Sequence, residues 1–148
     1  MYLDKNDKKQ GIWKSYHDGG AIHSIEEYKN GMLIGEMKYF HPNGNPKLVT
    51  QIQNGGLHGN HKEFYVNGKL MVSGYYHNGN NDGEWKEYSE DGLITEIYHY
   101  QSGLWHGNYE KYYPNGNIAE KGRYELDKKV GTWEYFDENG IVISIEKD

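Results

Sequence analysis

The sequence predicts an all-β fold, an elongated single-layer twisted antiparallel meander of about six 24-residue β-hairpin repeats. The first observation behind this prediction is a column of glycines that recurs every 24 residues, at Gly11, Gly35, Gly59, Gly83, Gly107 and Gly131. The second is another glycine column nine residues further on, at Gly20, Gly44, Gly68, Gly92, Gly116 and Gly140. A period of this length, unbroken by insertions or deletions, indicates one supersecondary unit copied along the chain.

The third observation is that large and aromatic residues stand in register between the two glycine columns. One column holds Trp13, Met37, His61, Trp85, Tyr109 and Trp133, and another, aromatic throughout, holds Tyr16, Phe40, Phe64, Tyr88, Tyr112 and Phe136. Disordered chains are depleted in such residues. We therefore interpret the composition, with 35% hydrophobic residues and 20 glycines, as that of a thin folded array.

We expect a single repeat domain over residues 1–148, because no change of composition and no low-complexity linker divides the chain. Residues 1–10 fit the second half of a repeat and predict a shortened leading strand. The repeats that follow span 11–34, 35–58, 59–82, 83–106, 107–130 and 131–148.

Each repeat contains two turn signals and therefore predicts two strands. In the first repeat these are a short strand at 12–17 and a longer one at 21–28, with a tight turn at 18–20 and a looser turn at 29–34. Twelve short strands, each paired with its neighbours in the sequence, would make the meander.

The tight turns carry the clearest local chemistry. The stretch His41-Pro42-Asn43-Gly44 places proline where a type I turn requires φ near −65° and glycine where the chain becomes left-handed. Three-residue hairpin loops that end in a bulge have this pattern. Helices are not expected, because Val, Ile, Tyr and Trp dominate the apolar positions and glycines interrupt every segment.

The rings within one repeat do not follow the alternation of a regular strand. Trp85 and Tyr88 are three residues apart, which would put them on opposite faces. Either a β-bulge realigns the two rings or both faces of the sheet carry rings. We expect most of the in-register rings to form the core of a trough-like sheet, with a binding groove for a peptide, a sugar or a lipid tail as the alternative.

The pattern GxWxxYxxNGxLxxxxxYxNGxxx resembles the MORN repeat in its bacterial variant form. It is almost complete in residues 83–106 and 107–130, and the resemblance covers residues 11–148. The sequence departs from the pattern at Pro46, Ile52, His61 and Asp127. The resemblance implies an extended sheet of stacked hairpins with a role in binding proteins or lipids and no catalytic residue. It also implies a similarity to bacterial proteins described as antitoxin components.

Composition disfavours several classes of function. A net charge of −6 is unlike that of nucleic-acid-binding domains, so we expect no nucleic-acid partner. The chain has no cysteine, and no serine elbow, P-loop or dinucleotide-binding motif follows a strand, so we expect no enzyme and no cofactor. His58 and His61 form the closest histidine pair, but a third ligand would lie one or two repeats away, so we expect no metal site.

The amino-terminal residues contain no apolar segment, and no apolar run approaches the length of a membrane span. As written, the chain is expected in the cytoplasm. An extracytoplasmic location is the alternative if a signal peptide has been removed.

A candidate partner surface lies in the looser turns. Trp105 occupies a position where the other repeats have no large ring, and it follows Leu104. Together with Met32, Leu33, Ile34 and Leu57 these residues would form an apolar ridge along one long edge of the sheet. Packing of the turns on one another is the alternative.

The last predicted strand is the second candidate surface. It is the most apolar and β-prone run of the chain, and its apolar residues include Ile141, Ile143 and Ile145. Such an edge accepts a strand from another molecule, which predicts a homodimer or strand addition by a partner. The alternative is that Glu146 and the charged residues after it keep the edge unpaired.

A column of Lys14, Lys38, Lys62 and Lys86 is open to two interpretations. It could be a basic lane that faces an anionic membrane, or a solvated face whose lysines pair with neighbouring glutamates. Considering all of these features, we predict a non-enzymatic protein–protein interaction scaffold, with an antitoxin or immunity-type binder of a bacterial toxin as its most specific form. The alternative is a surface-associated module that binds lipid headgroups or cell-wall glycan.

Overall fold

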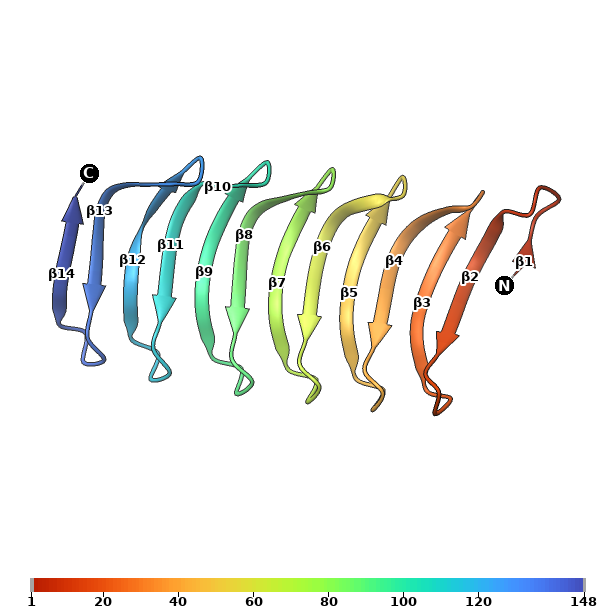
Figure 1. Ribbon diagram of the computed structural model, residues 1–148, viewed down its shortest axis with the longest axis horizontal. Coiled ribbons are helices and arrows are strands. Elements are labelled where there is room, and N and C mark those ends of the chain that lie inside the picture. The colour runs from red at the N-terminus through yellow and green to blue at the C-terminus, as the bar shows by residue number, and fades with distance from the viewer. Residues whose placement is uncertain (1, 148) are drawn as a thin grey trace.

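The computed structural model describes residues 2–147 and shows one open antiparallel sheet of fourteen strands, with no helix in that range (Figure 1). The elongated all-β meander predicted from the sequence is confirmed. The strands are β1 (Tyr2–Leu3), β2 (Lys9–Tyr16), β3 (Ile22–Lys29), β4 (Met32–Phe40), β5 (Pro46–Gln53), β6 (Gly56–Phe64), β7 (Leu70–His77), β8 (Asn80–Tyr88), β9 (Ile94–Gln101), β10 (Leu104–Trp105), β11 (Gly107–Tyr112), β12 (Ile118–Glu125), β13 (Lys128–Phe136) and β14 (Val142–Lys147).

The strands pair in chain order, and β10 pairs only with β9, so β10 and β11 together occupy the place of one strand. Apart from the two-residue strands β1 and β10, twelve strands remain, two for each repeat. No helix in residues 2–147 has the length and apolar character needed to cross a membrane.

The turns at the lower edge of Figure 1 have the geometry that their residues predict. In the second repeat the Gly44 N–H donates to the His41 carbonyl (2.9 Å), and the His41 N–H donates to the Asn45 carbonyl (2.8 Å). Gly44 has a φ of 88°, in the left-handed region. A register shift between Tyr39 and Phe40 marks the bulge that accompanies such a loop.

A bulge recurs beside the second aromatic column in every repeat, but it does not bring that column to the face of the first. The Phe136 ring lies against Lys121, which is the cross-strand partner of Glu134. Because Glu134 and Trp133 are adjacent on β13, they point to opposite faces. Phe136 therefore lies on the face opposite Trp133, and both faces of the sheet carry rings.

The upper turns differ from the sequence prediction. Residues 29–34 do not form a loose turn; the turn is the pair Asn30-Gly31, and β4 already begins at Met32. Asn30 and Gly31 have φ values of 54° and 80°, as a two-residue type I′ hairpin requires. The expectation of a loose turn was wrong because Asn-Gly satisfies both positive φ angles, so the strands continue up to the turn.

In the last upper turn the two left-handed positions are held by Leu126 and Asp127, with φ values of 49° and 66°. A leucine in this conformation is strained, because its Cβ approaches the following carbonyl oxygen.

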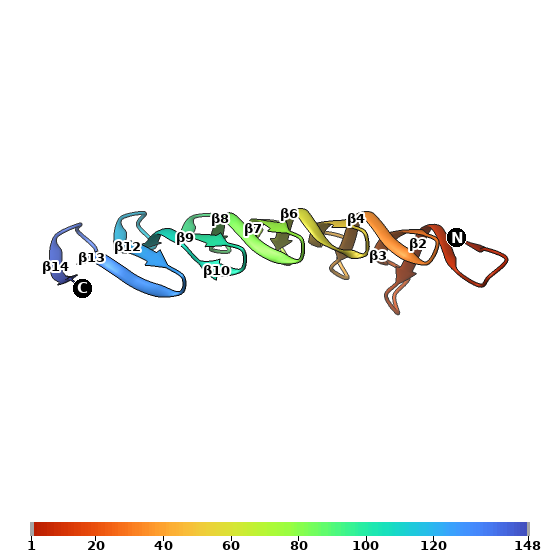
Figure 2. The ribbon, with the colours of Figure 1, turned by 90° about the horizontal axis from the view of Figure 1, so that it is seen from above.

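The first glycine column bends the strands that follow the upper turns. In β4 the bend is at Gly35, whose φ is 70°, and the pairing register with β3 shifts there. The segment before the bend runs along the long axis of the array, over the preceding hairpin (Figures 1 and 2). Each upper turn thus covers part of the repeat before it.

Hydrogen bonds tie successive repeats together at both long edges. At the lower edge the Asn43 side-chain amide donates to the Val66 carbonyl (2.8 Å), and the Tyr65 hydroxyl donates to the Tyr88 carbonyl (2.7 Å). At the upper edge the Gly79 N–H donates to the Leu57 carbonyl (2.8 Å). These contacts repeat at intervals close to one repeat length, so each copy helps to position the next.

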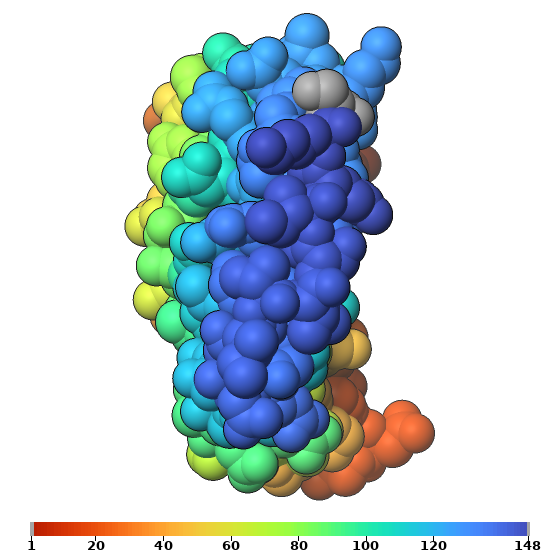
Figure 3. Space-filling model, turned by 90° about the vertical axis from the view of Figure 1, so that its left-hand side faces the viewer, coloured from red at the N-terminus to blue at the C-terminus, as the bar shows by residue number. Residues whose placement is uncertain are grey.

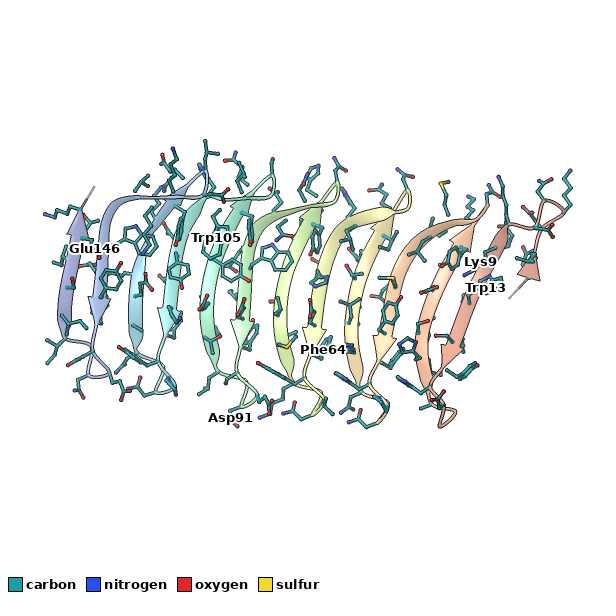
Figure 4. All side chains as sticks on the ribbon, viewed as in Figure 1. Lys9, Trp13, Phe64, Asp91, Trp105 and Glu146 are labelled. Carbon is teal, nitrogen blue, oxygen red and sulfur yellow. The ribbon has the colours of Figure 1, made fainter. Side chains whose placement is uncertain are left out.

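The core lies on one face of the sheet, here called the aromatic face, in the crooks that the bent hairpins form. Its buried residues are Trp85, Tyr98, Tyr109 and Trp133, with Val72, Tyr76, Tyr100, Trp105, Tyr124 and Tyr135 packed against them (Figure 4). The polar face, as we name the other side, carries the column of lysines and has no second layer over it in residues 2–147.

Candidate functional site

The two most buried tryptophans lie flat on glycines of the preceding hairpin. A Cβ built on Gly74 would come within 2.1 Å of the Trp85 ring, and one on Gly122 within 2.2 Å of the Trp133 ring. Trp85 and Trp133 are only 4% and 2% exposed. The absence of a side chain at these two glycines is therefore a packing requirement, and these indoles are part of the core.

Trp105 also packs within the chain. Its indole stacks on the Tyr98 ring, with centroids 5.0 Å apart and planes at 10°, and lies edge-on to Tyr124 at 4.8 Å. It also contacts Tyr100 and Tyr109. Of the two alternatives for this residue, the structure shows packing of the turn on neighbouring hairpins, with the ring half-buried at the upper ends of β9 and β11 (Figure 4).

The position of Trp105 has a role in other repeats that sequence reasoning missed. Near the end of repeat 107–130 the equivalent residue is Lys129, whose Nζ lies 3.9 Å from the centroid of the Trp133 ring. In the leading partial repeat it is Lys9, whose Nζ lies 4.7 Å from the Trp13 centroid. In three of its members the column therefore covers a ring, by cation–π contact in Lys9 and Lys129 and by stacking in Trp105. This role was not visible in the sequence because no single residue type occupies the column. Its members are Lys9, Leu33, Leu57, Asn81, Trp105 and Lys129.

The remaining ridge residues lie along the upper edge with unequal exposure. Leu33, Ile34 and Leu57 are half-buried, whereas Leu104 is 41% exposed. Leu104 directly precedes Trp105, so of these two neighbours one side chain is exposed and the other packs against rings of the core.

The isoleucines at the carboxy-terminal end are more exposed to solvent than the residues of the ridge. Ile141, Ile143 and Ile145 are 63%, 65% and 53% exposed. β14 pairs with β13 on one side and with no other strand among residues 2–147. Viewed along the long axis, β14 fills the near end of the array (Figure 3).

The lysines of the polar face make ion pairs along their own strands. Lys38 pairs with Glu36 and Lys86 with Glu84, each at 2.7 Å between nitrogen and oxygen. All four side chains are substantially exposed, so each pair contributes on the order of 0.5 kcal/mol or less. For these two lysines the solvated-face interpretation holds.

Other carboxylates lie on the aromatic face and accept hydrogen bonds from its polar groups. The Tyr98 hydroxyl donates to Glu87 (2.8 Å), and a His61 ring nitrogen lies 3.0 Å from Glu63. Burial, together with the bond to Glu87, raises the pKa of Tyr98 well above its usual value. Near neutral pH this tyrosine is therefore a neutral hydrogen-bond donor.

Tyr112 shows the same chemistry on the polar face. Its hydroxyl donates to Glu110. Burial first, and this hydrogen bond second, raise the pKa of Tyr112 to about 12. Tyr112 is thus also a neutral donor, and not a proton-transfer group, near neutral pH.

The two histidines of the closest sequence pair have separate surroundings. His58 packs edge-on against His77 at 5.3 Å between ring centroids, and His61 packs against Tyr76 at 5.2 Å. Within residues 2–147 no three His, Asp or Glu side chains are grouped as ligands for a metal ion.

The chain is similar in part to two solved structures. One is the Glycosylation Associate Protein (Gap123) complex from Streptococcus agalactiae, with 18% identity over 78% of this chain and 21% of that chain and a TM-score of 0.40. The other is accessory secretory protein 1, 2 and 3 in Streptococcus pneumoniae, with 12% identity over 91% of this chain and 21% of that chain and a TM-score of 0.25. The chain spans about a fifth of the length of both. No curated protein matches the sequence significantly.

The repeats themselves match a known family. The profile of the MORN repeat variant matches six segments, 9–30, 33–54, 57–80, 81–102, 105–125 and 129–146. Successive matches begin 24 residues apart and cover most of the array of hairpins. The chain therefore belongs to the MORN repeat variant family.

Proposed function

We propose that this protein is a non-catalytic scaffold that binds another protein. The observation that carries the proposal is a core confined to one face and to the crooks of the hairpins. In residues 2–147 the polar face and both long edges have no second layer, which offers contact surface along the whole sheet. A binding or scaffold role also agrees with membership of the MORN repeat variant family.

The proposed contact surface has two parts. The first is the upper edge, where Met32 and Leu104 are the most exposed residues of the ridge that also contains Leu33, Ile34, Leu57 and Trp105. Exposed apolar groups of this kind are typical of interaction sites.

The second part is β14, with Ile143 and Ile145, together with Ile141 just before the strand. Its free backbone groups can hydrogen-bond a strand of a partner, while pockets for alternate side chains give specificity. If the partner is a second copy of this chain, the same strand would mediate self-association.

The most specific form of the proposal is an antitoxin or immunity-type binder that covers a bacterial toxin. It is supported only by the family resemblance. The test is co-expression with a small toxic protein encoded next to the gene: an antitoxin restores growth and forms a stoichiometric complex with the toxin. Unchanged growth arrest would exclude this form without excluding a scaffold.

The general proposal is tested by affinity capture from the native organism with three versions of the chain. The unchanged chain should recover one partner in stoichiometric amount. Leu104→Glu and Ile143→Glu should each reduce recovery if their surface is used, because a charge must then be buried at the interface. Val66→Glu, at an exposed position of a lower turn, is the matched control and should bind normally.

Self-association is tested by light scattering on the purified chain. A dimer formed through β14 should become a monomer on Ile143→Glu and should be unaffected by Leu104→Glu. If the chain is a monomer at all concentrations, β14 binds a different partner or no partner.

A lipid- or glycan-binding module is the alternative. The stacking surface that a sugar would need is mostly used in the core, since Trp85 and Trp133 are 4% and 2% exposed. Co-sedimentation with anionic vesicles or with peptidoglycan would favour this alternative, whereas capture of one protein without co-sedimentation favours the scaffold.

A further inference from the structure

We propose that Asn54 is the site of a spontaneous modification of this protein, deamidation through a succinimide formed with Gly55. The sequence contains seven Asn-Gly dipeptides, at residues 30, 43, 54, 67, 78, 115 and 139 for the asparagines. In this dipeptide the backbone nitrogen of glycine, unhindered by a side chain, can attack the asparagine amide carbon. The structure distinguishes the seven by whether that nitrogen is free to react.

The four dipeptides in the lower turns are protected. Their glycine N–H groups each donate to a carbonyl of their own turn, as Gly44 does to His41 at 2.9 Å and Gly140 to Asp137 at 3.0 Å. In three of the four the asparagine side chain is also held, because its amide donates to a carbonyl of the next repeat, as in Asn115 to Glu138 at 2.8 Å. A nitrogen that already donates a hydrogen bond must lose that bond before it can attack.

Two of the three dipeptides in the upper turns are tied to the preceding hairpin. The Gly31 N–H donates to the Lys9 carbonyl (2.9 Å), and the Asn30 N–H donates to Gln10 Oε1 (3.1 Å). In the later turn Gly79 N–H bonds the Leu57 carbonyl at 2.8 Å, as described for the upper edge.

The Asn78 N–H of that later turn also donates to a side chain, His58 Nδ1, at 3.3 Å. A polar side chain of the preceding repeat thus captures each of these two turns.

Asn54-Gly55 is the exception. Within residues 2–147 neither its asparagine N–H nor its glycine N–H has a hydrogen-bond partner, and both residues are exposed. Gln10 and His58 occupy one position of the 24-residue period, 20 residues before Asn30 and Asn78; the same position before Asn54 is Ile34, whose side chain has no acceptor. A Cβ built on Gly55 meets nothing within 4 Å, so the site is also open to solvent. This turn therefore lacks the side-chain bond that holds the other two Asn-Gly turns of the upper edge.

The reaction needs no reactant other than water. Hydroxide removes the proton from the Gly55 nitrogen, which attacks Asn54 Cγ; the N–Cγ bond forms, the Cγ–Nδ2 bond breaks, and Nδ2 takes a proton from water and leaves as ammonia, which regenerates hydroxide. Water then opens the imide ring. Attack at the side-chain carbonyl yields aspartate, and attack at the backbone carbonyl yields isoaspartate, so each cycle consumes one water and releases one ammonia.

The product would alter the upper edge at a defined place. Isoaspartate inserts a methylene into the backbone of a two-residue type I′ turn, whose geometry tolerates little change. It also adds a negative charge in the turn that faces the hairpin of Leu33 and Ile34. The chemistry itself does not depend on the proposed scaffold function.

The test is incubation of the purified chain in mildly alkaline buffer, followed by peptide mapping by mass spectrometry. Asn54 should gain one mass unit, as a mixture of aspartate and isoaspartate, several-fold faster than Asn30 or Asn78. Equal rates in the three upper turns, or a fastest reaction in a lower turn, would overturn the proposal.

A reciprocal pair of variants tests the cause. Ile34→Gln introduces the side chain found at Gln10 and should slow the reaction at Asn54, whereas His58→Ile removes the acceptor and should speed the reaction at Asn78. Circular dichroism on both variants verifies that the sheet is intact. If either variant is unfolded, the other still decides, and unchanged rates in a folded variant would reject the proposed cause.

Discussion

The amino-terminal hairpins, β2 to β7, and the carboxy-terminal hairpins, β8 to β14, share one backbone design but not one core. In the carboxy-terminal half, rings from successive strands interlock, as in the pairs of Tyr109 and Tyr124 with Trp133 at 5.6 and 5.0 Å. In the amino-terminal half the same columns hold Met37, Thr50 and Ile52. All four members of the buried hydrophobic cluster lie in the carboxy-terminal half.

The difference shows that the hairpin array depends on its turns and hydrogen-bond ladders more than on any one core residue. Stability in a repeat protein is approximately a sum of terms from each repeat and from each interface between neighbours. We therefore expect the carboxy-terminal hairpins to be the more stable half and the amino-terminal ones to open first.

The strongest test of this comparison removes one residue from the same column in each half. Trp85→Ala should lower the free energy of unfolding by about 4 kcal/mol, because it empties a buried site. Met37→Ala should cost less than about 2 kcal/mol, since Met37 is only half-buried. Urea denaturation followed by circular dichroism measures both. Equal losses would show that the two halves are equally packed.

A second test concerns Trp105, whose ring joins β9, β11 and β12 within the stable half. Trp105→Ala should cost about 3 kcal/mol, because the ring contacts four tyrosines. Leu104→Ala is the matched control at the next residue and should cost about 0.5 kcal/mol. Unchanged stability in the Trp105 variant would mean that its ring serves a partner and not the core.

Alkaline pH should reduce the difference in stability between the two halves. Burial raises the pKa of Tyr98 and of Tyr109 far above the ordinary value of 10.0. Unfolded tyrosine ionises near pH 10, so the stabilisation is fully present below that pH. Above it the unfolded state releases protons that the folded state keeps, and stability falls as pH rises. Tyr28 and Tyr39 shift in the same direction but are less buried, so the carboxy-terminal half should lose more.

This pH effect can be followed by tryptophan fluorescence in a Trp13→Phe variant, whose three remaining indoles all lie in the carboxy-terminal half. Adding Tyr98→Phe should make the fluorescence transition less sensitive to alkali. An identical pH dependence in both variants would contradict the assignment to Tyr98.

The smallest effect is expected from relieving strain in the carboxy-terminal half. Leu126→Asn places a residue that tolerates positive φ in the last upper turn and should stabilise by about 1 kcal/mol. Asn30→Leu, the reverse change in the first upper turn, should destabilise by a similar amount. Thermal unfolding measures both, and a neutral Leu126→Asn would show that the turn relaxes without cost.

Much of the fold could be predicted because its signals are local. Proline, asparagine and glycine define the lower turns, and the ring columns define the hairpins. The upper turns were harder, since the strand after Gly31 crosses the preceding hairpin, and that crossing depends on hydrogen bonds between residues about one repeat apart.

Of the candidate site, the exposure of β14 follows from its position in the sheet order. The packing of Trp105 could not be predicted, because Lys9 and Lys129 cover rings by cation–π contact and Trp105 by stacking, so the column shows no common residue type. The covering role becomes apparent only when the bend at the first glycine column brings each turn over its neighbour.

The ladder at the lower edge has a consequence for how such a protein can change its length. Each asparagine side chain reaches a carbonyl 23 residues ahead, so its partner exists only if a full copy lies between them. Losing or gaining a single residue would break this correspondence and turn alternate side chains to the wrong side. Changes in length that keep this ladder intact must therefore add or remove whole copies, each of which is one hairpin of two strands.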